Sequence, residues 1–524
     1  MNGALALIET LLGSGIDTCF MNPGTSEMHF VASLDSAPNI KSVLCLFEGV
    51  ATGAADGYYR IAKKPAATLL HLGPGLGNGI ANLHNARRAF SAVVNIVGDH
   101  ATYHHGFDAP LESDVRGLAL PVSKFFKSSE SVDDLCIDVA SGITASMTYP
   151  RGVATVVLPA DLAWTEGAMS TTAQNFTPKT PQDANIIDEV AKIIASGKST
   201  AMLLGNNALT KDGILLATKI CEGTSVKLFA ETFPPVIERG HGVLPIDRLS
   251  YLAEFSQMQL AGIEHLILVE AKSPVSFFAY PNVPSSLIPT NCEVIELSDH
   301  TVDSIATLEF LADRLNVTSN LESATASDKK PEDTSGLTGD LNSQKLALII
   351  GDLLPENAIV SDESNTAGIH LSKATDNSAF HKWMCLTGGS IGQGMPLATG
   401  AAIAAPNQKI INIQADGSAM YTIQSLWTQA RENLDVITVI LDNQRYAILE
   451  MELSRVGATH GGKVASSMLD ISNPSIDFVS IAKSFNVEAF RAETAEEFRS
   501  AFLKCLSIEG PTLIHAILPI GLGM

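Results

Sequence analysis

The sequence has no long apolar run and little charge for its length. Charged residues make up 17% of the 524 residues, and no uninterrupted apolar segment reaches the length that a membrane-spanning helix needs. Residues 1–20 lack a basic leader and carry apolar residues at helical spacing, which predicts a first helix and not a signal peptide. We therefore expect a cytoplasmic protein with no membrane partner.

Paired cysteines and positive charge are also scarce. The seven cysteines are scattered without a Cys-x-x-Cys pair, which fits a reducing compartment better than a disulfide framework. The formal net charge is −22. Such a chain does not attract nucleic acid, and an anionic substrate would need cationic side chains placed locally.

What the sequence does contain is apolar residues and glycine. Hydrophobic residues make up 46% of the chain, with 40 glycines, and the length suggests roughly three domains. Strand and helix patterns alternate throughout, which predicts an α/β fold of three consecutive parallel-sheet, Rossmann-like domains. We place these domains at residues 1–170, 184–317 and 345–524, with a polar linker at 318–344.

One stretch, Lys409–Gln444, shows the pattern most clearly. A continuous apolar strand ends at Asp416, a helix-patterned segment follows, and a second strand ends just before Asn443. In a right-handed strand-helix-strand unit both residues reach the same carboxyl edge of the sheet. Their oxygens suit Mg²⁺ or Ca²⁺, and a turn at Gly417 suits a phosphate. The alternative is that both positions are simple strand ends.

This stretch resembles the thiamine diphosphate signature, Gly-Asp-Gly followed by Asn-Asn. Ala415 and Asp442 replace the first residue of each group, and Asp442 would bring an extra negative charge near a diphosphate. The resemblance implies a metal held by Asp416, Asn443 and the backbone carbonyl of Arg445. It also implies cofactor contacts from Gly417, Ser418, Asn443 and Tyr446.

A second resemblance lies in the first domain. The segments NPGTSE and FEGVATGAADGYYR resemble the pyrimidine-binding domain of thiamine diphosphate decarboxylases and acetohydroxyacid synthases. The catalytic glutamate of that family falls on Glu48, where a buried carboxyl with a raised pKa would activate the pyrimidine ring. The alternative is a glutamate favoured at a helix start by the helix dipole. The glycines and alanines that follow Glu48 predict a helix packed close to the sheet.

Histidines mark two further loops. HLGPGLGN resembles the benzoylformate decarboxylase loop, which implies proton transfer by His71 with Thr25 and places Gly24 in the substrate pocket. Adjacent histidines like His104 and His105 also occur in the active site of pyruvate decarboxylases, which implies a catalytic role for this pair. The alternatives are a structural His71 and a solvated histidine pair.

The segment LTGGSIGQGMP resembles the family loop that runs between the two rings of the cofactor. It implies that Gly389 contacts the cofactor and that Ile391 holds it bent. Ile448 falls where relatives set pocket size, and Phe277 could line a substrate pocket or an interdomain core. The middle domain resembles a six-stranded Rossmann-like domain, and without a GxGxxG motif we do not expect FAD.

The resemblance covers essentially the whole chain and implies a thiamine diphosphate- and Mg²⁺-dependent enzyme acting on a 2-oxo acid. We expect an acetolactate synthase-like carboligation of pyruvate, or a similar acid, with an aldehyde or ketone acceptor. The alternatives are a non-oxidative decarboxylase of the benzoylformate type and a non-catalytic subunit of the same fold. Because family sites lie between subunits, we expect a homodimer or homotetramer.

Overall fold

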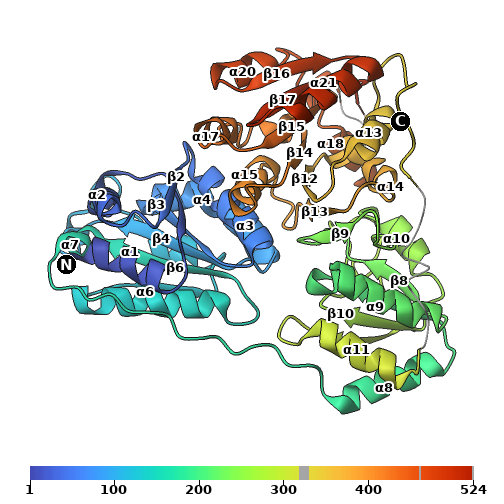
Figure 1. Cartoon of the computed structure of the whole chain (residues 1–524), viewed down its shortest axis with the longest axis horizontal. Coiled ribbons are helices and arrows are strands. Elements are labelled where there is room, and N and C mark those ends of the chain that lie inside the picture. Colours follow the sequence, from blue (N-terminus) through green and yellow to red (C-terminus); the bar gives the residue numbers. More distant parts are fainter. Residues whose placement is uncertain (318–329, 459–461, 522–524) are drawn as a thin grey trace.

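Three β-sheets, each flanked by helices, make up the protein in the computed structural model (Figure 1). The structure describes residues 1–317, 330–458 and 462–521. Residues 318–329, the first part of the expected linker, lie outside the described residues. Within the described part, no helix combines the length and the apolar character needed to cross a membrane. The α/β class with mostly parallel sheets is thus confirmed.

The first sheet has the order β2-β1-β3-β4-β6-β5, and all of its strand pairs are parallel. Its strands are β1 (Thr18–Met21), β2 (Lys41–Leu44), β3 (Ala66–His71), β4 (Val93–Asp99), β5 (Phe125–Ser128) and β6 (Val153–Pro159). The helices around it are α1 (Gly3–Gly13), α2 (Met28–Ser33), α3 (Glu48–Ala62), α4 (Leu72–Arg88), α5 (Val115–Ala119), α6 (Val132–Met147) and α7 (Ala160–Trp164).

The two faces of this sheet belong to different cores. Alternate strand residues such as Met21 and Leu69 pack with α1 and α6 on one face, while Phe20 and Leu70 pack with α3 and α4 on the other. This division follows from the period-two alternation of side chains along strands.

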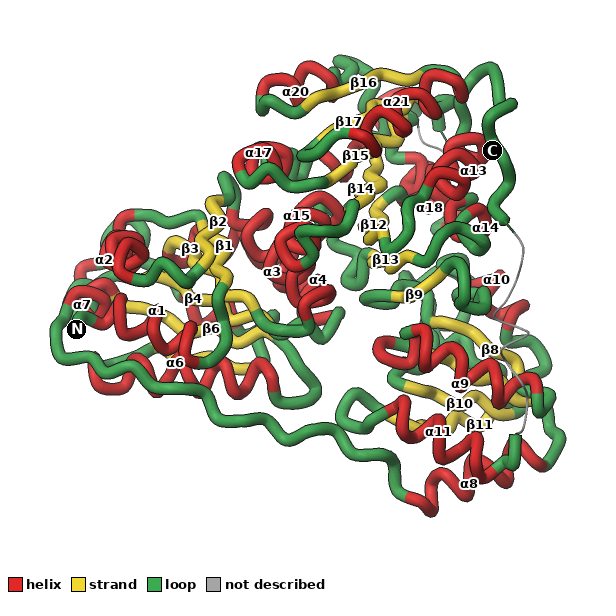
Figure 2. Tube along the Cα trace, viewed as in Figure 1, coloured by secondary structure: helices red, strands yellow, loops and turns green. Residues whose placement is uncertain are grey.

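The middle sheet has the order β11-β10-β7-β8 in the described residues. Its strands are β7 (Thr200–Leu204), β8 (Lys227–Ala230), β10 (His265–Val269) and β11 (Glu293–Ser298), with helices α8 (Ala184–Ala195), α9 (Lys211–Glu222), α10 (Ala253–Gln259) and α11 (Ser304–Arg314). The expectation of six strands was therefore wrong. The next strand in the chain after β8, β9 (Ile237–Arg239), pairs antiparallel with β13 (His381–Cys385) of the third sheet. A long loop connects α7 to α8 (Figure 2).

The third sheet has the order β16-β17-β15-β14-β12-β13-β9. Its other strands are β12 (Ala358–Glu363), β13 (His381–Cys385), β14 (Ile410–Ala415), β15 (Val436–Asp442), β16 (Glu488–Ala492) and β17 (Thr512–Ile517). Its helices are α13 (Ser343–Leu353), α14 (Leu371–Ala374), α15 (Gly394–Ala404), α16 (Asp416–Ala419), α17 (Ser425–Arg431), α18 (Ala447–Arg455), α19 (Lys463–Ser467), α20 (Phe478–Ser484) and α21 (Ala495–Ser507).

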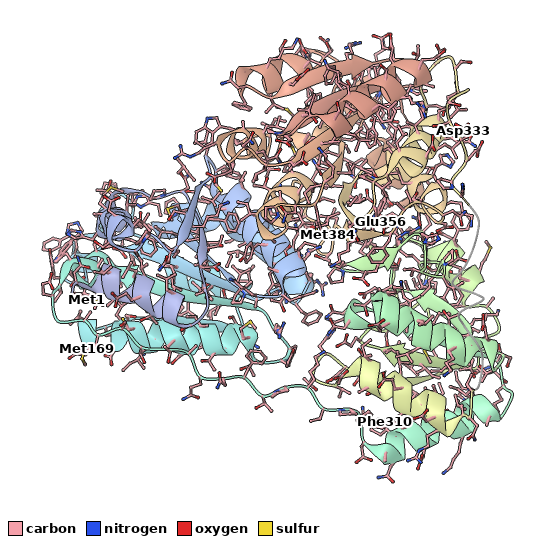
Figure 3. The ribbon with its side chains drawn as sticks, in the orientation of Figure 1. Met1, Met169, Phe310, Asp333, Glu356 and Met384 are labelled. Carbon is pink, nitrogen blue, oxygen red and sulfur yellow. The ribbon has the colours of Figure 1, made fainter. Side chains whose placement is uncertain are left out.

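Helices α3 and α15 join the first and third sheets. A Cβ added at Gly57 would lie 2.1 Å from the carbonyl oxygen of Leu397, and one at Gly400 would lie 1.8 Å from that of Ala54. Glycine is needed at both positions because the two backbones approach so closely. Gly57 of α3 thus allows close contact with α15, while Val50 and Ala54 of the same helix pack against the first sheet, as the sequence predicted. Met384 of β13, labelled in Figure 3, belongs to the shared core.

Candidate functional site

Glu48 is the first residue of α3 and lies at the carboxyl edge of the first sheet, just after β2. It is only 6% exposed. Nδ2 of Asn78, on α4, donates a hydrogen bond to its Oε2 (3.0 Å). A Cβ at Gly75 would lie 3.2 Å from Oε1, so the glycine-rich start of α4 leaves little free space around the carboxyl group. The structure therefore holds Glu48 as a buried acid with one amide donor.

His71 ends β3 at the same edge and is paired with a carboxylate. Its Nδ1 lies 2.8 Å from Oε2 of Glu27, which is fully buried. The backbone N–H of Gly24 donates to the same oxygen (2.6 Å), and the hydroxyl of Ser26 donates to Oε1 (2.7 Å). A carboxylate on one ring nitrogen fixes the orientation of an imidazole and leaves the other nitrogen available.

The loop at Gly24 is shaped around this histidine. A Cβ at Gly24 would lie 2.3 Å from the imidazole ring of His71, so only glycine fits there. The hydroxyl nearest to His71 is that of Ser26, 3.3 Å from Nδ1, while Thr25 is exposed. Sequence reasoning singled out Thr25 and missed Ser26 and Glu27. The signal for Glu27 was available, because a glutamate three residues after Gly24 completes a capping arrangement.

His104 and His105 follow β4, the next strand of the sheet. Nδ1 of His105 lies 2.9 Å from Oε1 of Glu112, and this hydrogen bond raises the pKa of His105. The ring of His104 lies beside that of His100, with centroids 5.3 Å apart. Within the described residues, neither His104 nor His105 hydrogen-bonds to His71, Glu27 or Glu48. The structure places the pair at the same sheet edge and does not bring it into the His71 cluster.

Asp416 and Asn443 follow the adjacent parallel strands β14 and β15, in which Ala415 is the register partner of Leu441. The predicted shared edge is therefore present. Asp416 accepts backbone hydrogen bonds from Gly417 (2.7 Å) and Gln444 (2.8 Å). Burial raises the pKa of Asp416 to about 7, and the nearby carboxylate of Asp442 adds to the shift. Such a group is stabilised by a cation.

Asp442 itself faces β17. Nε2 of His515 lies 2.7 Å from Oδ2 of Asp442, and both residues are buried. We expected the Asp442 carboxylate to lie near the diphosphate. In the structure it is held by a histidine on the neighbouring strand. His515 was not among the residues predicted from the sequence.

The remaining predicted cofactor residues surround Asp416. A Cβ at Gly417 would lie 2.5 Å from the ring of Tyr446, so these two residues are in close contact. The hydroxyl of Ser418 accepts from Nδ2 of Asn365 (3.1 Å). The backbone N–H of Arg445 donates weakly to Oδ1 of Asn443 (3.3 Å). The N–H of Gly417, which we expected to face a phosphate, donates instead to the Asp416 carboxylate.

The loop 386–393 is held by a buried acid at the end of β12. Glu363 accepts from the backbone N–H groups of Gly392 and Gly394, each at 2.6 Å. Gly389 has a φ of 72°, in the left-handed region that glycine adopts easily. A Cβ on it would lie 2.5 Å from the ring of Phe277. Ile391 and Ile448 are half-buried.

Asn82 is one of the side chains that connect the first domain with the third. Nδ2 of Asn82, on α4, donates to the carbonyl of Gly49 (2.8 Å) and to that of Gly392 (3.2 Å). In residues 1–317, 330–458 and 462–521, no hydrogen bond runs directly between the Glu48 and His71 cluster and the Asp416 cluster. We name these two separate groups of residues the Glu48 half-site and the Asp416 half-site.

The donor atoms at Asp416 fit a magnesium-bound diphosphate. The expected set contains one carboxylate, one amide oxygen and one backbone carbonyl, all hard oxygen ligands. The buried carboxyl group of Asp416, whose pKa burial raises to about 7, also favours a positive charge at this site.

Together, the fold and these clusters define an α/β protein of the thiamine diphosphate enzyme class. Residues 1–118 match the N-terminal TPP binding domain of thiamine pyrophosphate enzymes, and residues 365–516 match the C-terminal TPP binding domain. Thiamine pyrophosphate is the same compound as thiamine diphosphate. The chain belongs to the thiamine pyrophosphate enzyme family.

Two relatives align with this chain over almost the whole length of both proteins. The "Putative acetolactate synthase large subunit IlvX" of Mycobacterium tuberculosis is 49% identical over 523 residues, with 99% of each chain covered. The benzoylformate decarboxylase of Pseudomonas aeruginosa is 26% identical over 535 residues, with 97% of each covered. The predicted family is therefore confirmed.

A solved structure shares the fold. It is the thiamine diphosphate-dependent 4-hydroxybenzoylformate decarboxylase of Rhodococcus jostii RHA1. The TM-score is 0.85 at 23% sequence identity, with 99% of each chain covered.

Proposed function

We propose that the chain is a thiamine diphosphate- and Mg²⁺-dependent enzyme that decarboxylates a short 2-oxo acid such as pyruvate. It then joins the remaining acyl unit to a second carbonyl compound, an aldehyde or a ketone. The observation that carries the enzymatic proposal is the buried Glu48 carboxyl, because a non-catalytic scaffold has no use for such an acid. The acetolactate synthase name of the relative at 49% identity supports ligation.

Two regions of the chain would bind different parts of the cofactor. Residues 345–524 would hold the diphosphate, with Mg²⁺ bound by Asp416, Asn443 and the carbonyl of Arg445. Residues 1–170 would hold the pyrimidine ring, where Glu48 would exchange a proton with a ring nitrogen. Gly389 and Ile391 would shape the bent cofactor, with Gly417, Ser418 and Tyr446 around it. Bound thiamine diphosphate supplies the electron sink that lets CO₂ leave.

His71 would handle protons at the substrate. Glu27 holds Nδ1, so Nε2 is the nitrogen available to exchange a proton with the carbonyl oxygen of the substrate. Gly24 and Ser26 beside it would line the pocket, with Thr25, His104 and His105 as further candidates from the same sheet edge. Phe277 and Ile448 would limit the pocket from the other half-site.

The His71–Glu27 pair also favours a second candidate, a non-oxidative decarboxylase of the benzoylformate type. In that case the acyl unit receives a proton in place of a second carbonyl carbon. A non-catalytic subunit is the third candidate, motivated by Ala415 and Asp442. The Asp442–His515 pair weakens that motivation, because it directs the extra carboxylate toward β17.

We further propose a homodimer or homotetramer in the cytoplasm. A second copy would bring its Glu48 half-site to the Asp416 half-site of the first, which supports the assembly because no direct hydrogen bond joins them within one described chain. The free cysteines support a reducing compartment.

The test is turnover of pyruvate with thiamine diphosphate and Mg²⁺, with and without an added aldehyde. CO₂ release and carbon products are followed together. Acetolactate or a mixed acyloin supports ligation, and free aldehyde alone supports the decarboxylase. Absence of CO₂ from pyruvate and from larger 2-oxo acids contradicts both and leaves the non-catalytic subunit.

A further inference from the structure

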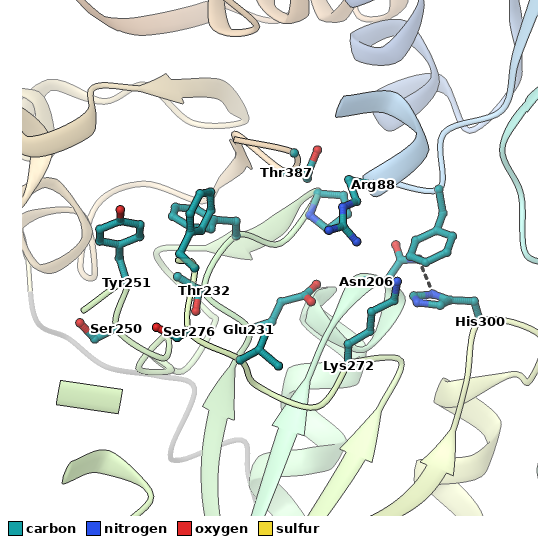
Figure 4. A pocket seen from close by; sticks show the side chains of 16 residues that line it. Arg88, Asn206, Glu231, Thr232, Ser250, Tyr251, Lys272, Ser276, His300 and Thr387 are labelled. Atoms are coloured by element: carbon teal, nitrogen blue, oxygen red, sulfur yellow. Dashed lines mark hydrogen bonds between the residues drawn. The ribbon is translucent and has the colours of Figure 1, made fainter. Parts of the chain in front are cut away.

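A cavity of about 350 Å³ lies between the three sheets, next to the loop 386–393 (Figure 4). The end of α4, the carboxyl edge of the middle sheet and the residues Thr387 and Gly388 line it together. The carboxyl edge of a parallel sheet is the usual place for a ligand in α/β proteins. The volume falls at the lower end of the range for small-molecule sites.

Two cations face this cavity without a carboxylate partner. In the part of the chain that the structure describes, neither Arg88 nor Lys272 forms a salt bridge or a side-chain hydrogen bond, and both line the cavity (Figure 4). Burial and the nearby charges of Arg88 and Arg87 lower the pKa of Lys272. Positive charge therefore accumulates here in a chain whose net charge is −22.

The acid that lines the cavity, Glu231, forms no salt bridge with either cation among the described residues. Burial raises the pKa of Glu231 to about 8, which favours the neutral form of its carboxyl group. Burial also lowers the pKa of His300 to about 4, so its imidazole is neutral as well. The cavity is thus suited to an anionic group near Arg88 and Lys272.

Aromatic rings form the other walls. The rings of Phe90 and His300 lie 3.7 Å apart between centroids, and the Lys272 ammonium lies 5.2 Å above the ring of Phe90. Toward the loop 386–393, Tyr251 and Phe277 have centroids 5.3 Å apart. Flat rings of this kind contact a planar ligand over a large area at little entropic cost. The hydroxyl of Ser276 lines the same space and is buried without a hydrogen-bond partner among the described residues.

Phe277 connects the cavity to the expected reaction centre. It lines the cavity and also packs against Gly389, where a Cβ would lie 2.5 Å from its ring. Gly388 and Thr387, which precede Gly389, line the cavity too. A ligand in the cavity would therefore reach the cofactor loop from the side of the middle sheet.

We propose that one carbonyl substrate of this enzyme carries a planar ring and a distal anionic group, and that the ring lies in this cavity with the anion at Arg88 and Lys272. This inference rests on the proposed function and names its substrate class. With such an aldehyde as acceptor, the bond between the carbonyl carbon and carboxylate of pyruvate breaks and CO₂ leaves. A carbon–carbon bond forms to the aldehyde carbon, and the aldehyde oxygen gains a proton. A 2-oxo acid donor that carries the same ring and anion would lose CO₂ from its carbonyl carbon, which gains a proton in its place and leaves the aldehyde.

Two matched pairs of compounds test this. The acceptor pair is 4-carboxybenzaldehyde and benzaldehyde, each with pyruvate, and the donor pair is 4-carboxyphenylglyoxylate and phenylglyoxylate. The wild type should show the higher kcat/KM for the carboxylated member of at least one pair. Lys272→Met and Arg88→Gln should each lower that preference about tenfold to a hundredfold, as expected for the loss of a hydrogen bond to a charged group. Arg87→Gln removes a charge from the same helix end without lining the cavity, and should keep the preference.

Calorimetric titration of terephthalate into the cofactor-free protein gives a second readout without turnover. Its Kd should rise in Lys272→Met and Arg88→Gln and stay unchanged in Arg87→Gln. If the uncharged compounds are turned over and kcat/KM is no higher for the carboxylated member of either pair, this inference is overturned and the proposed function stands. A wild type inert toward pyruvate and all four compounds would overturn the proposed function, and the substrate assignment with it.

Discussion

His515 Nε2 lies 2.7 Å from Oδ2 of Asp442 in the interior of the third sheet. The two residues come from the neighbouring strands β17 and β15. Asp442 stands where the family signature has an asparagine, directly before the expected metal ligand Asn443. The imidazole of His515 donates a hydrogen bond to the added carboxylate. We therefore infer that the aspartate at position 442 depends on the histidine at position 515.

Replacing His515 should therefore weaken cofactor binding as well as folding. His515→Gln leaves a buried carboxylate without its histidine, which should cost about 1–3 kcal/mol of unfolding free energy. The free carboxylate should also lower the affinity for thiamine diphosphate with Mg²⁺. Urea denaturation and calorimetric titration measure the two effects.

The double variant Asp442→Asn with His515→Gln is the control, because it removes the charge and the histidine together. It should recover most of both losses. If the single and double variants behave alike, the pair is not coupled.

Glu48→Gln should bind thiamine diphosphate nearly as well as the wild type and lose most turnover. The amide keeps the shape of the side chain and its contact with Asn78, but it cannot exchange a proton with the pyrimidine ring. General acid–base groups contribute about a hundredfold to ten-thousandfold in rate. Steady-state kinetics and cofactor titration measure the two quantities.

Glu166→Gln is a suitable control, since the side chain of Glu166 is 78% exposed and lies outside both clusters. Wild-type activity in Glu48→Gln would remove Glu48 from the mechanism.

His71→Ala should slow decarboxylation by a similar factor while changing the cofactor affinity little. Glu27→Gln should produce a smaller loss of kcat, because it weakens the orientation of His71 without removing the imidazole. His29→Ala, an exposed histidine on the following helix, controls for general effects. An unchanged rate in His71→Ala would assign this histidine a structural role only.

Much of the fold could be predicted from the sequence because its strands are short apolar runs with polar ends. The shared edge of Asp416 and Asn443 followed from the parallel strand-helix-strand rule. The transfer of β9 to the third sheet could not be predicted, because three residues carry too little pattern to choose between two sheets.

The place of a candidate residue was predictable where that residue marks a strand end, as with Glu48 and His71. It was not predictable where a contact joins segments that are distant in the sequence. Glu27 packs beneath His71 because Gly98, on another strand, leaves room for its carboxyl group. The residues near Gly98 in the sequence do not indicate that this position leaves room for Glu27. The pairing of His515 with Asp442 spans 73 positions and has the same character.

The final prediction concerns pH and Mg²⁺. Burial and Asp442 raise the pKa of Asp416 from 3.8 to about 7 in the folded protein without metal. A raised carboxyl pKa means that folding favours the protonated form, so its contribution to stability is complete below about pH 4 and is lost as the pH rises to about 7. Mg²⁺ binds only the ionised form, in competition with the proton.

The increase in Tm caused by Mg²⁺ with thiamine diphosphate should therefore be small at pH 5.5 and grow toward pH 8. Differential scanning calorimetry across this range measures it. Asp416→Asn should be more stable than the wild type at pH 8 without metal, since it removes a carboxylate that is costly to ionise, and it should show little increase in Tm with Mg²⁺. A Tm increase that is equally large at pH 5.5 and pH 8 would mean that a group other than Asp416 holds the metal.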